Sequence, residues 1–259
     1  MNQIATKLFF LSMAPFLVID IFSAAHQSKP APTIGLLIMA TGKYTVFLKD
    51  LMESADAYFL PGYARTYFIF TDGTVSQTPN VVRIEQKRLG WPHDTMMRFS
   101  VYLKAASYFE NIDYLFACDA DMLFVNTVGN EILGQRVATR HPGFSMPEQR
   151  RDDYERNAAS TACVRDGEGV YYFAGGFYGG TTTEFLTLAS VCAEHINQDL
   201  AHNIIAKWHD ESHLNRYFID NPPTVILSPS YCYPEFWNLP FKPCLLALSK
   251  DHKEFQSAL

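Results

Sequence analysis

The feature that most constrains the fold is an alternation, between residues 34 and 118, of short apolar runs with segments of helical periodicity. Short apolar runs bounded by turn residues are typical of strands buried on both faces of a parallel sheet. The order strand, helix, strand predicts an α/β fold, in which an open twisted sheet has right-handed crossovers and flanking helices. The predicted strands are Ile34–Thr41, Arg65–Thr71, Val81–Ile84 and Asp113–Cys118, and the predicted helices are Val46–Phe59 and Met96–Phe109.

Composition excludes several classes of protein. The chain has 259 residues, enough for one sizeable domain, and 48% hydrophobic against 19% charged residues excludes a disordered chain. A net charge of -6 shows no basic surplus, so no nucleic-acid partner is expected. The five cysteines form no C-x-x-C pair and their number is odd, which argues against a zinc site and against a complete disulfide framework. We expect mostly buried free thiols.

The N-terminal residues form a separate segment. An apolar run, Leu8–Ala25, follows Lys7 and ends in small residues, as in a signal peptide or signal-anchor. Pro15 and Asp20 weaken a membrane-spanning reading, and a non-spanning N-terminal extension is the alternative. We expect residues 1–32 to form a signal or signal-anchor with a short linker, with membrane association or a secretory location, and residues 33–259 to form one catalytic domain.

Two aspartates directly follow the last of the predicted strands. Asp119 and Asp121 project to the same side of an extended segment, at the edge where open α/β sheets bind ligands. Two such close negative charges need a cation or hydrogen-bond donors to neutralise them. Mg²⁺ or Mn²⁺ with a diphosphate satisfies this, since both ions prefer oxygen ligands. An exposed turn with two solvated acids is the alternative.

A second cluster, Trp208–Asn215, contains two acids, two imidazoles and an indole within eight residues. If the segment is helical, Trp208, Glu211 and Asn215 share one face. The order HDESH is not the H-E-x-x-H of a zinc protease. The third candidate, Tyr171–Gly180, pairs glycines with aromatic residues. It predicts a bent strand lining a pocket, without the G-x-G-x-x-G order of a phosphate-binding loop.

In this order, these segments resemble glycosyltransferase family 6, which contains the histo-blood-group A and B transferases, the α-1,3-galactosyltransferase and shorter bacterial relatives. The resemblance extends from about Thr33 to Leu248. The matching segments are ATGKYTVFLKDLMESADAYFLPG, YFIFTDG, W-x-x-D-T-M-M-R, YLFACDADMLF, RHPGF, DYER, GEGVYYFAGGFYGG, WHDESHLNRYF and PTVILSPSYC. The resemblance implies a GT-A type fold, Rossmann-like, with one catalytic domain.

The resemblance also implies a donor site. Asp119 and Asp121 match the ligands of Mn²⁺ (or Mg²⁺) and UDP, and Tyr44 matches a ring that stacks on the uracil. A small residue at Gly176 leaves room for an N-acetyl group, which favours UDP-GalNAc over UDP-Gal. Lys250 and His252 match a tail that closes over UDP. The full set of implied donor contacts is Met39, Ala40, Thr41, Tyr44, Arg98, Asp119, Ala120, Asp121, Ala174, Gly175, Gly176, Asp210, Lys250 and His252.

Catalysis and acceptor binding follow from the same resemblance. Glu211 matches the acid beneath the anomeric carbon, which either attacks it or stabilises an oxocarbenium-like state, with retention in both cases. His141, Asp153, Trp208 and Glu211 match acceptor contacts. The expected activity is transfer of GalNAc or Gal from the UDP-sugar to a terminal β-galactoside, with α-1,2-fucosylation expected on that acceptor.

Three alternatives remain at this stage. One is a UDP-Gal-specific α-1,3-galactosyltransferase, and another is a UDP-sugar hydrolase or a transferase of a different hexose such as glucose. The third is an inactive glycan-binding homologue, against which Glu211 argues because binding alone does not require that acid. The sequence predicts no oligomeric state.

Overall fold

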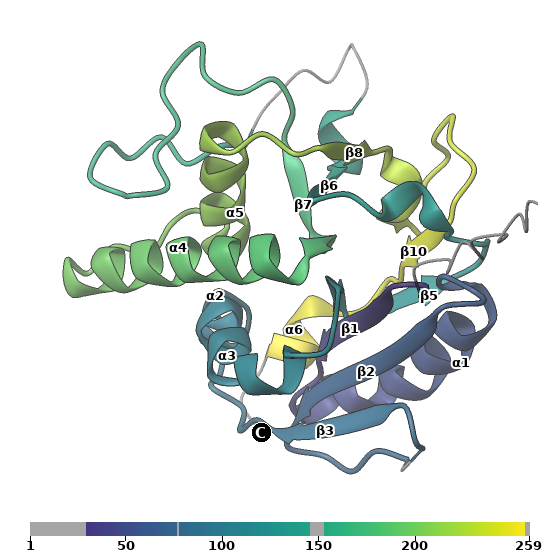
Figure 1. The fold of residues 1–259 in the computed structure, drawn as a ribbon. Helices are drawn as coiled ribbons and strands as arrows, with labels where there is room; N and C mark the ends of the chain where they lie inside the picture. The colour runs from purple at the N-terminus through teal and green to yellow at the C-terminus, as the bar shows by residue number, and fades with distance from the viewer. Residues whose placement is uncertain (1–29, 77, 146–152, 257–259) are drawn as a thin grey trace, which may run out of the picture. The chain divides into compact units, whose positions relative to one another are not determined.

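A computed structural model describes residues 30–76, 78–145 and 153–256 of the chain (Figure 1). The strands are β1 (Thr33–Met39), β2 (Ala64–Thr71), β3 (Val81–Glu85), β4 (Tyr114–Asp119), β5 (Met122–Phe124), β6 (Arg136–Arg140), β7 (Phe173–Thr181), β8 (Val225–Leu227), β9 (Tyr233–Pro234) and β10 (Leu245–Ala247). The α-helices are α1 (Leu48–Tyr58), α2 (His93–Met96), α3 (Arg98–Lys104), α4 (Thr182–Ala201), α5 (His209–Asp220) and α6 (His252–Gln256).

The main sheet has seven strands in the order β3-β2-β1-β4-β7-β6-β8. The first four are parallel, whereas β7 runs antiparallel to both β4 and β6. Successive strands lead away from β1 on one side as β2 and β3, and the chain then returns to its other side as β4. This reversal is a topological switch point, where open α/β sheets bind ligands. Figure 1 shows it near the centre of the sheet.

Both faces of the sheet are buried, as a continuous apolar strand requires. In β1, Ile34, Leu36 and Ile38 pack in one hydrophobic cluster with Leu51 of α1. Leu37, which points the opposite way, belongs to a second cluster that includes residues of α3, α4 and α5. The alternation along one strand thus decides which helices cover which face. The predicted α/β class is confirmed.

One predicted helix, Met96–Phe109, is wrong as a single element. The chain forms α2, then α3, then a 3-10 turn over Ala106–Phe109, with Met97 and Ala105 outside helical geometry at ψ 5° and 7°. The break at Met97 lets the side chain of Arg98 donate from Nε to the carbonyl of Thr95, 3.3 Å away. A local interruption that the apolar spacing does not reveal therefore directs an arginine toward the switch point.

The other predicted segments need smaller changes. The predicted helix Val46–Phe59 begins as a 3-10 turn over Gly42–Phe47 and continues as α1. The turn starts at Gly42, whose φ of +56° favours glycine and whose N–H donates to Asp72 Oδ1 at 2.9 Å. All five cysteines are free, as predicted.

The prediction for the N-terminal segment falls almost entirely outside the described residues, which start at residue 30. The domain boundary at Thr33 stays a prediction. Within the described ranges, no helix is both long and apolar enough to cross a membrane.

Candidate active site

The carboxyl ends of β1 and β4 lie side by side at the switch point, where Met39 pairs with Asp119. Asp119 ends β4, and Asp121 follows after a single alanine. The side chain of Asp119 is 37% exposed, whereas that of Asp121 is buried. Burial, and next the negative charge of Asp119, raises the pKa of Asp121. The strand geometry thus creates the strained pair of carboxylates that the sequence predicts.

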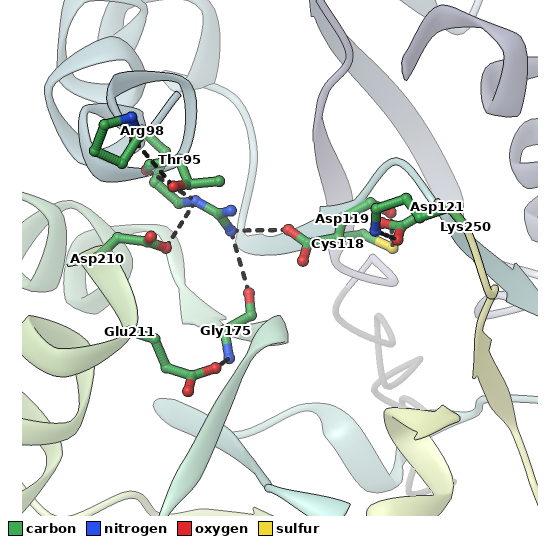
Figure 2. Close-up of polar contacts among 10 residues, drawn as sticks. Thr95, Arg98, Cys118, Asp119, Asp121, Gly175, Asp210, Glu211 and Lys250 are labelled. Carbon is green, nitrogen blue, oxygen red and sulfur yellow. Dashed lines mark hydrogen bonds and ion pairs between the residues drawn. The ribbon is translucent and has the colours of Figure 1, made fainter. Parts of the chain in front are cut away.

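Arg98 connects this pair to the rest of the site (Figure 2). Its buried guanidinium donates from Nη1 to Asp119 Oδ1 at 2.9 Å and to the carbonyl of Gly175 at 3.2 Å. Its Nε lies 3.0 Å from Oδ2 of Asp210. One planar group therefore fixes three segments, β4, β7 and α5, around a common point.

The first turn of α5 provides two acids, Asp210 and Glu211. Burial raises the pKa of Asp210 despite the opposing charge of Arg98. Burial also raises the pKa of Glu211 to about 7, although the backbone N–H of Gly175 donates to its Oε2 at 2.7 Å and opposes the shift. Two acids held in one turn with raised pKa values are typical of a catalytic centre.

The predicted bend in the glycine-rich segment is confirmed in β7. The register with β6 jumps so that Ala138 faces Tyr178 and Thr139 faces Ala174, which leaves the residues between without partners in β6. A Cβ on Gly175 would lie 3.4 Å from Glu211 Oε2 and 3.7 Å from Asp210 Oδ2. The backbone at Gly175 can therefore approach both acids closely because it has no side chain.

A pocket opens beside the aspartates, and most of the predicted donor contacts lie around it. The ring of Tyr44 faces the ammonium of Lys250, 5.4 Å from the ring centroid, and Lys250 pairs with Asp121. The side chain of Ala40 is fully buried and does not line the pocket. The lining residues include Met39, Thr41, Tyr44, Arg88, Trp91, Asp94, Arg98, Asp119, Ala120, Asp121, Lys250, His252 and Phe255.

Sequence reasoning did not identify three of these lining residues, Arg88, Trp91 and Phe255. Phe255 lies against Tyr44 with ring centroids 5.2 Å apart. Trp91 contacts the imidazole of His209 edge-on at 4.8 Å. Both rings are far in sequence from the aspartates, so only the fold shows that they belong here.

The predicted acceptor residues form a second wall. The indole N–H of Trp208 donates to Asp153 Oδ2 at 2.6 Å, and Lys207 pairs with the same carboxylate. Burial opposes ionisation of Asp153, but these two donors outweigh it and lower its pKa. Burial lowers the pKa of His141 to about 4, so its imidazole is neutral near pH 7. Nδ1 of His141 accepts the N–H of Gly143 at 3.1 Å, which leaves Nε2 as the donor.

The prediction that Trp208, Glu211 and Asn215 share a helix face is wrong for Trp208. The helix starts one residue later, because the Ser212 hydroxyl accepts the N–H of Trp208 at 2.9 Å. Trp208 is 45% exposed, whereas Asn215 is buried and bonds both the N–H and the carbonyl of Phe173 at 2.8 Å. Asn215 thereby holds β7 against α5.

Tyr172 is a further residue that sequence reasoning missed. Its hydroxyl is buried without a hydrogen-bond partner among the described residues, and the charge of Glu211 acts on it. Its ring meets that of His141 at 5.6 Å. This tyrosine therefore lies between the acceptor wall and the acids of α5.

An open sheet with an acidic pair at its switch point, a pocket beside that pair and two acids facing it defines the class of GT-A type glycosyltransferases. The sequence model of glycosyltransferase family 6 matches residues 17–258. The chain belongs to this family, as its motifs predict.

Named relatives come from animals and bacteria. The globoside alpha-1,3-N-acetylgalactosaminyltransferase 1 of Gallus gallus is 36% identical over 236 residues, 86% of this chain and 68% of that protein. The histo-blood group ABO system transferase 1 of Rattus norvegicus is 38% identical over 211 residues, 78% of this chain and 61% of that protein. The O-antigen biosynthesis glycosyltransferase WbnI of Escherichia coli is 30% identical over 207 residues, 78% of this chain and 88% of that protein. The chain thus spans less than two thirds of the rat relative, and nearly nine tenths of the bacterial one.

Proposed function

We propose that this protein is a retaining alpha-1,3 hexosyltransferase that moves GalNAc, or Gal, from a UDP-sugar to the terminal galactose of an oligosaccharide. The observation that carries the proposal is the convergence of Asp119, Gly175 and Asp210 on the guanidinium of Arg98, with Glu211 held beside them. The family match and the relatives named for this linkage support it.

The residues at the switch point fit a divalent cation. Asp119 and Asp121 offer carboxylate oxygens, the donor type that Mn²⁺ and Mg²⁺ prefer. The pair already attracts positive charge, since Arg98 lies on one carboxylate and Lys250 on the other. No group of three or more acids, histidines or cysteines able to hold a metal occurs in the described ranges. The remaining ligands would therefore come from the donor diphosphate and water. When bound, the ion supplies positive charge that stabilises departing UDP.

The protein's own groups divide the remaining work. Arg98 and Asp210 orient the hydroxyls of the donor sugar. Tyr44 offers a ring face for the uracil, and Lys250 and His252 stand beside the diphosphate. Glu211 places a carboxylate under the anomeric carbon, where it either attacks or stabilises an oxocarbenium-like state.

The acceptor side is proposed to bind a terminal galactose with α-1,2-linked fucose. His141 donates from Nε2 to an acceptor hydroxyl, and Trp208 presents an indole fixed by Asp153. A secretory or bacterial-envelope location, with association to a membrane through residues 1–32, accompanies the proposal. Residues 33–259 are the proposed catalytic domain.

The test measures UDP release from UDP-GalNAc and from UDP-Gal. Each donor is assayed with Mn²⁺ or EDTA, and with or without an α-1,2-fucosylated galactoside. We expect acceptor-stimulated release that EDTA abolishes, faster with UDP-GalNAc because Gly176 leaves room. Analysis of the product by NMR should show an α linkage. Full activity in EDTA would refute the metal assignment, and no release with either donor would refute the transferase.

The control is a pair of variants with matched charge changes. Asp119→Asn/Asp121→Asn removes both carboxylates of the switch point and should abolish Mn²⁺-dependent turnover. Asp50→Asn/Asp56→Asn, on the exposed part of α1, should leave turnover unchanged.

A further inference from the structure

Gly176 has a close neighbour that the donor-selecting segment does not contain. A Cβ placed on Gly176 would lie 3.2 Å from Sγ of Cys232, 3.6 Å from Oδ2 of Asp119 and 3.8 Å from Sδ of Met122. The first distance is shorter than the ~3.5–4.0 Å at which non-bonded atoms attract most strongly. The thiol of Cys232 therefore takes up part of the space that the missing side chain would leave free.

The position of Cys232 places it within the site, far along the chain from β7. It follows a 3-10 turn, Pro229–Tyr231, and is partly buried. The charges of Asp119, Glu211 and Asp121 all act on its thiol, so it faces the centre of the site. No glycine at 176 can enlarge the pocket beyond the limit that this sulfur sets.

The other side of Gly176 is already fixed. Asp119 is held by Arg98 at 2.9 Å and so cannot move away easily. Met122 is buried in β5. Of the three neighbours, only Cys232 is both small and free of a hydrogen bond among the described residues that would hold it in place.

We infer that Cys232 is a second donor-selecting residue, which acts with Gly176 to set the room for the 2-acetamido group of the donor sugar. This inference rests on the proposed UDP-sugar transfer. It extends that proposal because selection depends on a pair of residues from two segments, and not on the glycine alone. A smaller residue at 232 favours GalNAc, and a larger one favours Gal.

The experiment measures kcat/KM for UDP-GalNAc and for UDP-Gal, and compares their ratio among variants. Cys232→Ala should raise the GalNAc to Gal ratio about 10-fold, and Cys232→Leu should lower it about 10-fold, the effect of about one methylene in a pocket. Cys163→Ala, a partly exposed cysteine in the loop before β7, is the matched control and should leave the ratio unchanged. Ratios within twofold of wild type in both Cys232 variants would overturn the inference.

A double-mutant cycle tests the pairing itself. Gly176→Ala should lower the ratio, because its methyl would press on the sulfur, and Gly176→Ala/Cys232→Ala should recover most of the loss. Strictly additive effects would contradict a shared space. The Kd for UDP, measured by calorimetry, should stay within about twofold in every variant, which separates a lost fold from a changed preference.

The failure of this inference differs from the failure of the proposed function. If wild type transfers neither sugar, the proposed function is refuted. If wild type transfers sugar but its preference does not respond to residue 232, only the pairing of Gly176 with Cys232 is refuted.

Discussion

Replacement of Arg98 by methionine tests whether the guanidinium is the structural centre of the site. The side chains of Arg98 and Asp210 are 9% and 8% exposed, so this pair is buried, whereas Asp119 is 37% exposed. Removing one partner of a buried pair costs about 3–5 kcal/mol, and an exposed pair contributes only about 0–1 kcal/mol. We therefore expect Arg98→Met to lower the free energy of unfolding by about 3–5 kcal/mol, nearly all through Asp210. For a chain of this size that lowers Tm by roughly 6–20 °C.

The pH dependence of this loss has a definite sign. Without the guanidinium, the already raised pKa of Asp210 rises further, because burial then acts unopposed by that cation. The folded variant keeps a proton that the unfolded chain has released, so its stability falls as pH rises. The penalty of Arg98→Met should be larger at about pH 8 than at about pH 5.

The assay is urea unfolding of wild type, Arg98→Met, Asp210→Asn and the double variant. We expect the double variant to recover at least half of the loss, because it no longer buries an unpaired carboxylate. Lys49→Met, which breaks only the exposed pair with Glu53, should cost less than about 1 kcal/mol. A cost below about 1 kcal/mol for Arg98→Met, or no recovery in the double variant, would refute the reasoning.

Two further predictions concern groups that face the proposed reaction centre. Glu211 must be ionised to act, and burial raises its pKa to about 7, so kcat/KM should fall as pH drops below about 7, while Glu211→Gln should lack turnover at every pH and still bind UDP. A kcat/KM profile that is flat down to about pH 5.5 would contradict this role. Asn215→Ala leaves the N–H and carbonyl of Phe173 unpaired, at about 1–3 kcal/mol each, and should lower both Tm and kcat. Asn126→Ala, which removes one bond to Pro243, is its control, and an equal loss in both variants would argue against a special role for Asn215.

The sequence predicted most of what is local. The apolar runs identified β1 to β4 because buried strands leave a continuous apolar signal. The D-x-D pair was placed at a strand end because chain order alone shows which residues follow a strand. The spacing did not show the break at Met97, since an apolar face continues through it.

Several parts of the candidate site depend on long-range packing. The bonds from Arg98 to Asp119, Asp210 and Gly175 join residues 21 to 112 positions apart, and only the sheet order brings them together. Likewise, Lys250 reaches Asp121 across 129 positions.

The sequence by itself determined the fold class, the family and the kinds of chemical group available, because each is written in residues that are neighbours along the chain. The tertiary structure decided their charges and their space. It buried Glu211 and so raised its pKa, neutralised His141, and set the sulfur of Cys232 against Gly176. The physical reason is that solvation, electrostatic interaction and exclusion of volume depend on distance in space. They do not depend on separation in sequence.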